Sequence, residues 1–307
     1  MFMQPVMDYP NTLNTTYPSR NHDFTKEKVA KMSAVVEEKI RHFKASPTVG
    51  IICGSGLGEV TKAVKEAVTI AYKDIPGFPR STVQGHAGQF VIGYINEVLV
   101  VCMQGRFHFY EGYDIGTCCM PIKLLKLLGC HSLIISNAAG GLNPKFNVGD
   151  IMVIHDHINL MGFSGNGPLV GPNDEAWGPR FLSMHNAYSP AYIKEARDLL
   201  RKKNLPDHVG VYTALGGPQF ETVAELRLLQ AQGVDAVGMS TVHEVVMARY
   251  LGLRVFSFSL ITNKCPTTYE ADKNVNHQEV IDTGREKAQV LVDFVRDMVP
   301  VINSVRD

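Results

Sequence analysis

The segment VGIICGSGLG (49–58) decides the fold, because a short apolar run suited to a buried strand ends abruptly in a glycine-rich turn. Further apolar runs predict strands at 90–94 and 98–103, which suit an antiparallel pair, and at 132–136, 151–155, 210–215 and 254–261. Helical spacing predicts helices over 24–45, 115–128, 190–203 and 223–233, then from a Thr241/Glu244 capping box to Gly252, and from Asn276 to about 298. This alternation predicts one α/β domain over 24–307, after a polar arm over 1–23.

Composition excludes several classes of protein. Apolar residues make up 45% of the 307, and 30 Lys and Arg balance 30 Asp and Glu, so no broad charge footprint for nucleic acid or an anionic membrane exists. The six cysteines form no C-x-x-C pair and are too sparse for a disulfide scaffold, so we expect a reducing, cytoplasmic location. The first residues lack the pattern of a signal peptide, and no apolar run approaches the roughly 18 to 20 residues of a membrane span.

Most of the predicted strands end in small, polar, glycine-rich turns. In open α/β sheets ligands bind at the carboxyl ends of the strands, so these segments predict one composite pocket. They are GSGLG (54–58), QGRFHFYEG (104–112), NAAGG (137–141), GGPQFE (216–221), GMST (238–241) and TNK (262–264).

Two of these segments suggest an anion site. In GSGLG, bare amides and the Ser55 hydroxyl precede a helix expected near Glu59, an arrangement that suits a phosphate, although a plain tight turn explains the same residues. Arg106, His108 and Tyr110 share one face if their segment is extended, and would add donors to an anion. The alternative is a sheet edge with a solvated arginine. Neither G-x-G-x-x-G nor a P-loop motif occurs, which disfavours a dinucleotide or nucleoside triphosphate site.

Other chemistries lack their patterns. No G-x-S-x-G is present for a serine hydrolase, and His155 and His157 have no second ligand pair that would support a metal site, so we predict no metal. Glu221 begins a predicted helix, where a carboxylate is expected in any case. Asn263 ends a very apolar strand, where an amide needs a specific partner. A base with donors and acceptors would satisfy both side chains.

Together these motifs resemble the trimeric purine nucleoside phosphorylases, in order and spacing, from about residue 25 to the C-terminus. The resemblance also rests on NAAGGLNPKFNVGDIMVIHDHINLMGFSG (137–165), GPNDE (171–175), FETVAE (220–225), DAVGMSTVHEV (235–245) and GLRVFSFSLITNK (252–264). It implies a mixed, partly barrel-like sheet flanked by helices, a homotrimer, and phosphorolysis of nucleosides such as inosine and guanosine to free base and ribose 1-phosphate. No cofactor is implied, since phosphate is the co-substrate.

The resemblance also implies roles for individual residues. Phosphate would contact Ser55, His86, Arg106, His108, Ala138 and Ser240. Ribose would contact Tyr110, Phe220, Met239 and His277, with Phe181 reaching in from a neighbouring subunit. The base would contact Ala138, Phe220, Glu221, Thr262 and Asn263. His108, Glu221, Asn263 and His277 are the residues expected to be catalytic.

The chain departs from the family pattern at several places. VQGHAG stands for VPGHAG, GGPQFE for AGPSFE, and His243 for a proline, while the expected apolar lid becomes Cys265-Pro266-Thr267-Thr268. We expect these changes to surround the base subsite, and hypothesise that 6-amino purine or pyrimidine nucleosides are accepted. The alternatives are a methylthioadenosine phosphorylase, a family with aspartate in place of Asn263, and a non-catalytic nucleoside-binding protein. The sequence leaves open the base preference, the conformations at 84–88 and 264–272, and the role of the arm.

Overall fold

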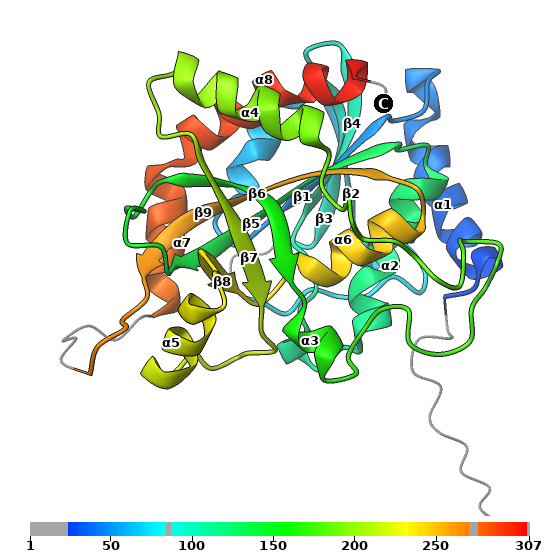
Figure 1. Ribbon diagram of the computed structural model, residues 1–307. Helices are drawn as coiled ribbons and strands as arrows, with labels where there is room; N and C mark the ends of the chain where they lie inside the picture. Colours follow the sequence, from blue (N-terminus) through cyan, green and yellow to red (C-terminus); the bar gives the residue numbers. More distant parts are fainter. Residues whose placement is uncertain (1–23, 84–86, 270–275, 306–307) are drawn as a thin grey trace, which may run out of the picture.

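The computed structural model describes residues 24–83, 87–269 and 276–305. One mixed sheet runs through the molecule, with helices on both faces (Figure 1). Its strands are β1 (Val49–Cys53), β2 (Lys65–Ala71), β3 (Gln89–Ile95), β4 (Val98–Gln104), β5 (Ser132–Gly141), β6 (Ile151–Ile158), β7 (His208–Ala214), β8 (Ala236–Gly238) and β9 (Arg254–Lys264). The α-helices are α1 (Lys26–Ile40), α2 (Ile115–Leu127), α3 (Leu160–Phe163), α4 (Pro190–Lys202), α5 (Val223–Ala231), α6 (Val242–Tyr250), α7 (His277–Glu286) and α8 (Ala288–Ser304).

The sheet is open at one end and closed at the other. Its order is β2-β3-β4-β1-β5-β8-β7-β6-β9, and β9 also pairs with β5, so β5, β8, β7, β6 and β9 form a closed ring. The strands β4, β1, β5 and β9 are parallel neighbours, whereas β8 and β6 run antiparallel to β5 and β9 respectively. The predicted mixed, partly barrel-like α/β fold is therefore confirmed.

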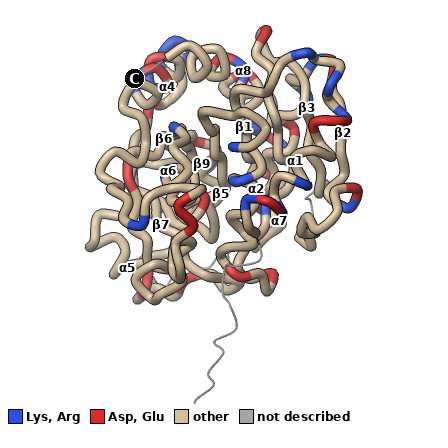
Figure 2. The backbone as a smooth tube through the Cα atoms, turned by 90° about the vertical axis from the view of Figure 1, so that its right-hand side faces the viewer, with Lys and Arg blue, Asp and Glu red and all other residues tan. Residues whose placement is uncertain are grey.

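Two apolar layers hold the helices against the sheet. On one face α1, α2 and α6 pack on the sheet through residues such as Val36, Leu124 and Val245. On the other face α4 and α8 pack through Tyr192 and Phe294, which are fully buried. Burial of these faces supplies the main driving force for folding. In Figure 2, Lys and Arg are interspersed with Asp and Glu along the chain.

The predicted elements are confirmed at 49–53, 115–128, 190–203 and the antiparallel pair β3–β4, and other predictions need correction. NAAGG and TNK are not turns, because they are the last residues of β5 and β9, and Gly140 and Gly141 pair with Asn263 and Lys264. The helix expected near Glu59 is the 3₁₀ helix η2 (Gly58–Ala63). The single last helix is two helices, α7 and α8, and it ends at Ser304 rather than 298. β2, β8 and α3 were not predicted. Three further 3₁₀ turns are η1 (Arg41–Phe43), η3 (Tyr72–Asp74) and η4 (Phe109–Glu111).

Candidate functional site

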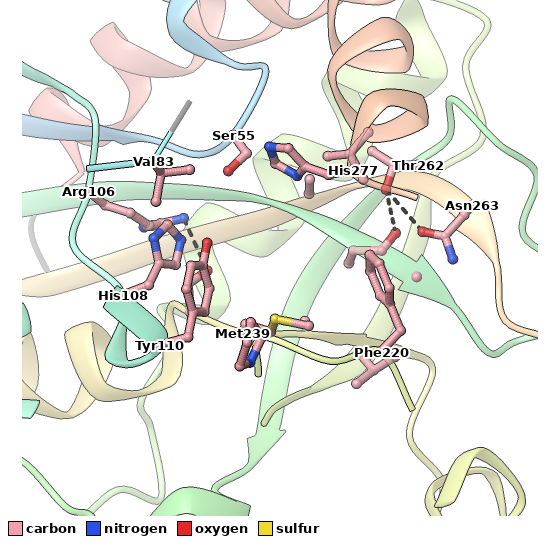
Figure 3. Close-up of a pocket in the computed structure, with 18 of the residues that line it drawn as sticks. Ser55, Val83, Arg106, His108, Tyr110, Phe220, Met239, Thr262, Asn263 and His277 are labelled. Atoms are coloured by element: carbon pink, nitrogen blue, oxygen red, sulfur yellow. Dashed lines mark hydrogen bonds between the residues drawn. The ribbon is translucent and has the colours of Figure 1, made fainter. Parts of the chain in front are cut away.

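A cavity of about 430 Å³ collects all six polar segments predicted to form one pocket, as expected for a drug-sized ligand. In Figure 3, Ser55, Arg106 and His108 lie at one end, Thr262, Asn263 and Phe220 lie at the other, and Tyr110 and Met239 lie between them. The predicted residues that line the cavity are Ser55, Arg106, His108, Tyr110, Ala138, Phe220, Glu221, Met239, Ser240, Thr262, Asn263 and His277.

Arg106 is the most constrained side chain at the anion end. Its guanidinium is 1% exposed and makes a bidentate ion pair with Glu244, at 3.0 Å from Nε and 2.8 Å from Nη2. Nη1 donates to the Ser136 carbonyl oxygen at 2.7 Å and to Ser240 Oγ at 3.2 Å. The solvated arginine considered from the sequence is therefore excluded. Gly54 permits this packing, because a Cβ there would lie 2.8 Å from the Asn137 Cα.

His108 is held by a neighbouring carboxylate. Glu111 Oε1 accepts from the His108 backbone N–H at 2.7 Å and lies 3.2 Å from Nδ1, while Oε2 accepts from the Thr82 N–H and hydroxyl. Burial raises the pKa of Glu111, but the hydrogen bonds from His108 and Thr82 outweigh burial and lower it to about 2. An ionised carboxylate only accepts, so His108 Nδ1 carries the proton. Burial lowers the pKa of His108, which is neutral at pH 7 and presents the Nε2 lone pair.

The segment 104–112 is not extended, contrary to the sequence expectation. Residues Phe109–Glu111 form a 3₁₀ turn, and the rings of His108 and Tyr110 stack at 4.7 Å with an interplanar angle of 15°. Arg106, His108 and Tyr110 nevertheless all line the cavity. The predicted grouping is thus correct, although a turn rather than a strand produces it.

The opposite end of the cavity offers an amide and a carboxyl group. The Thr262 hydroxyl donates to Asn263 Oδ1 at 3.2 Å, which leaves the Asn263 Nδ2 donor for a ligand (Figure 3). Burial raises the pKa of Glu221, and the Glu225 carboxylate raises it further. Burial and, to a lesser extent, the Glu221 carboxylate raise the pKa of the Cys265 thiol to about 12. This end can therefore exchange hydrogen bonds of both kinds with a planar base.

The helix α6 does not begin with the predicted capping box. Thr241 is its N-cap but has a φ of 74° and a ψ of −55°, and its side chain makes no cap hydrogen bond. Glu244 pairs with Arg106 instead of with the N-cap backbone. The anion end of the cavity therefore uses both groups that the local sequence assigned to helix capping.

His243 lies on the anion side, which corrects the expectation that the unusual residues surround only the base end. It is 3% exposed, and both ring nitrogens have no hydrogen-bond partner among the described residues. Burial lowers its pKa to about 4, with further influence from the nearby Glu244, Arg106 and His108.

Of the other residues considered from the sequence, one lies away from the cavity, one falls outside the described residues and one has a partner elsewhere. Phe181 is 89% exposed and does not line the cavity, and His86 lies outside the described residues. His157 Nδ1 is 2.8 Å from the Tyr188 hydroxyl. Among residues 24–83, 87–269 and 276–305, no group of three or more His, Cys, Asp and Glu could hold a metal ion.

Sequence reasoning gave three side chains no role at the site: Glu111, Glu244 and Thr82. Glu111 lies three residues from His108, and that spacing was the only signal available for it. The partner of Glu244 is 138 residues away in the chain, so no local pattern reveals it.

No helix within the described part of the chain is both long and apolar enough to cross a membrane.

Comparison with known proteins gives consistent results. The model of the phosphorylase superfamily matches residues 48–300. The purine nucleoside phosphorylase of Mus musculus is 52% identical over 260 residues, which cover 83% of this chain and 89% of the mouse protein. That of Anopheles gambiae is 51% identical, covering 84% and 73% of the two chains. The crystal structure of Schistosoma mansoni purine nucleoside phosphorylase with adenosine has a TM-score of 0.85 at 42% identity, covering 92% of this chain and 98% of that one. Isoform 2 from the same organism, with cytosine and ribose-1-phosphate, has a TM-score of 0.85 at 38% identity, covering 91% and 97%.

Proposed function

This chain belongs to the phosphorylase superfamily and, within it, to the purine nucleoside phosphorylases, and we propose that its cavity performs the phosphorolysis of purine nucleosides as described below. The enzyme is a pentosyltransferase. One observation supports the assignment of the cavity above all others. A cradle of anion donors and a pair of base-directed groups face each other across a single cavity that a nucleoside and a phosphate would fill.

Phosphate would bind at the end formed by Ser55, Arg106, His108 and Ser240, with the Ala138 backbone and His86. Arg106 and Ser240 supply donors to its oxygens. His108 presents Nε2 as an acceptor, which suits the P–O–H of hydrogen phosphate. The cradle thereby holds one phosphate oxygen in line with the anomeric carbon of a ribose that rests on Tyr110 and Met239 and contacts Phe220 and His277.

Glycosidic cleavage would leave negative charge on the purine. A phosphate oxygen bonds to C1′ as the C1′–N9 bond breaks, and the bonding electrons leave with the base. Asn263 Nδ2 then donates to N7, where this charge gathers, and Glu221 accepts from N1–H. The proton of hydrogen phosphate balances the proton that the base gains. The reaction as written needs no metal or organic cofactor.

We also propose that base selectivity is broadened. The polar residues that follow Asn263 stand where an apolar lid was expected. A Cβ on Gly140 would lie 2.5 Å from Cys265 Sγ, so Cys265 packs tightly against the base end of the cavity. Related Schistosoma enzymes have been solved with adenosine and with cytosine. Asn263, in place of the aspartate of methylthioadenosine phosphorylases, favours 6-oxopurine nucleosides as the main substrates.

A homotrimer remains our proposal for the assembly. Phe181 is almost fully exposed in one chain, as a residue that completes the ribose subsite of a neighbouring subunit would be. The cytoplasm remains the predicted location.

The test is release of free base from inosine, guanosine, adenosine and cytidine, each with and without inorganic phosphate. We expect phosphate-dependent release from inosine and guanosine, and slower but measurable release from adenosine or cytidine. Release from inosine and guanosine alone would refute the broadened selectivity. Release that is independent of phosphate, or binding without release, would refute phosphorolysis.

A further inference from the structure

The turn that carries Ser240 has an unusual backbone. The Val242 N–H donates to the Ser240 carbonyl oxygen at 2.8 Å, which closes a three-residue turn around Thr241. With φ at 74° and ψ at −55°, this is the positive-φ form of the γ-turn, which is rare and strained. A β-branched residue is especially unfavourable there. Strain of this kind persists only where surrounding contacts fix it, so the contacts of Thr241 identify what the turn is for.

Those contacts form a chain of hydrogen bonds that ends at Ser240. Asn137 Nδ2 donates to Thr241 Oγ1 at 2.9 Å, and Thr241 Oγ1 lies 3.3 Å from Ser240 Oγ. Arg106 Nη1 also donates to Ser240 Oγ. Asn137 and Thr241 are 1% and 0% exposed, and neither lines the cavity, whereas Ser240 does.

The direction of this chain follows from the chemistry of its ends. An amide NH₂ and a guanidinium can only donate, so Thr241 Oγ1 accepts from Asn137 and Ser240 Oγ accepts from Arg106. The Thr241 hydrogen is then available to donate to Ser240 Oγ. When Thr241 donates in this pair, two donors are directed at the Ser240 oxygen and the Ser240 hydroxyl keeps its own hydrogen for a further acceptor. Because Ser240 lines the cavity, a ligand there can accept it. An anion such as phosphate, which accepts hydrogen bonds, is the matching ligand.

We propose that Asn137 and Thr241 are positioning residues that orient the Ser240 hydroxyl as a donor to phosphate. This inference rests on the proposed function, in which Ser240 contacts phosphate. It assigns the strained turn a role, because the γ-turn brings the Thr241 hydroxyl next to that of Ser240, at the cost of an unfavourable backbone.

The test compares Thr241→Val with two other variants. Thr241→Val keeps the side-chain shape but removes the hydroxyl, Thr241→Ser keeps the hydroxyl, and Thr213→Val is the matched control. Thr213 is also fully buried, and its hydroxyl donates to the Ile158 carbonyl oxygen at 2.8 Å, away from the cavity. The measurements are binding of inorganic phosphate by calorimetry, KM for phosphate and for inosine, kcat, and the melting temperature.

We expect Thr241→Val to weaken phosphate binding and raise KM for phosphate about tenfold, with KM for inosine within about twofold of the wild type. Thr241→Ser should restore phosphate binding to within about twofold. Thr213→Val should lower the melting temperature without changing phosphate affinity. If Thr241→Val does not fold, Thr241→Gly, which accepts the positive φ without strain, should show the same loss of phosphate binding.

Two results would overturn the proposal: phosphate affinity within about twofold of the wild type in a folded Thr241→Val protein, or equal loss of affinity in Thr213→Val. Failure of the proposed function would look different, since the wild type would then release no base from any nucleoside. Calorimetry with phosphate would still compare the variants in that case and would decide the role of Thr241 by itself.

Discussion

The buried pair of Arg106 and Glu244 leads to a prediction that separates a role in folding from a role in anion binding. The two side chains are 1% and 2% exposed and share two hydrogen bonds at 2.8 and 3.0 Å. Removing one partner of a buried pair leaves an uncompensated charge and costs about 3–5 kcal/mol. Glu244→Gln keeps the shape of the side chain, so we expect a loss near the lower limit, about 3 kcal/mol of the free energy of unfolding.

Phosphate should partly reverse this loss. In Glu244→Gln the Arg106 charge has no buried counterion, so a bound phosphate replaces the missing negative charge. We therefore expect phosphate to bind this variant more tightly than the wild type and to raise its free energy of unfolding by more. The assay is guanidinium unfolding at fixed protein concentration, with and without inorganic phosphate, alongside kcat for inosine, which should fall. Glu27→Gln, in an exposed pair with Lys31, is the control and should change stability by less than about 0.5 kcal/mol.

A double variant completes the test. Arg106→Met with Glu244→Met replaces the pair by apolar side chains, which is often nearly neutral for stability, although the Ser136 carbonyl oxygen then loses a donor. We expect this protein to be more stable than Glu244→Gln and to gain nothing from phosphate. The reasoning is refuted if Glu244→Gln loses less than about 1 kcal/mol, or if phosphate stabilises it no more than the wild type.

Three further predictions concern other residues of the site. Burial raises the pKa of Glu221, so the charged acceptor for N1–H is lost as the pH drops through that raised value. We expect kcat/KM for inosine to fall in this pH range, whereas turnover of adenosine should not fall with it. Glu221→Gln should flatten this acid limb of the pH profile. Burial lowers the pKa of His243 to about 4, so the unfolded chain protonates this side chain at a higher pH than the folded protein does. This titration leaves the free energy of unfolding unchanged above pH 6.5 and lowers it as the pH falls toward 4. Because both ring nitrogens are buried without a described partner, His243→Leu should raise the free energy of unfolding by about 1–2 kcal/mol at pH 7, measured by chemical unfolding, and by more at pH 5. Phe181→Ala should raise KM for inosine several-fold and leave KM for phosphate unchanged, whereas Leu228→Ala, also exposed, should change neither.

The sequence predicted the site better than it predicted the elements that form it. NAAGG was expected to be a turn because glycine, alanine and asparagine are poor strand formers. In the structure it is part of β5, and small residues are needed there because the neighbours are very close: a Cβ on Gly141 would lie 2.9 Å from the Ile261 side chain. Tertiary packing therefore overrides local preference at this strand. The predicted placement of the polar residues at one edge of the sheet is nevertheless correct, because both β5 and β9 end at the cavity.

The capping box at Thr241 and Glu244 failed for a different reason. A carboxylate three residues after a threonine predicts a helix start from local energetics alone. An arginine buried against the same helix offers that carboxylate a stronger partner, and the sequence does not show that Arg106 and Glu244 meet. Residues with two competing partners are thus where local patterns fail, and in this protein they are concentrated at the anion end of the cavity.

The charge of that end bears on the chemistry proposed for it. Glu244 compensates Arg106, His108 is neutral because burial lowers its pKa, and the ionised Glu111 that holds His108 adds a negative charge, so this end has no excess positive charge. A phosphate dianion bound there is held by oriented donors and keeps most of its negative charge, which can stabilise the positive charge that develops on the ribose in the transition state. An uncompensated arginine would bind phosphate more tightly and would also neutralise the charge that the ribose needs. The compensating carboxylate therefore accounts for the paired predictions for Glu244→Gln, in which phosphate stabilises the protein more while kcat for inosine falls.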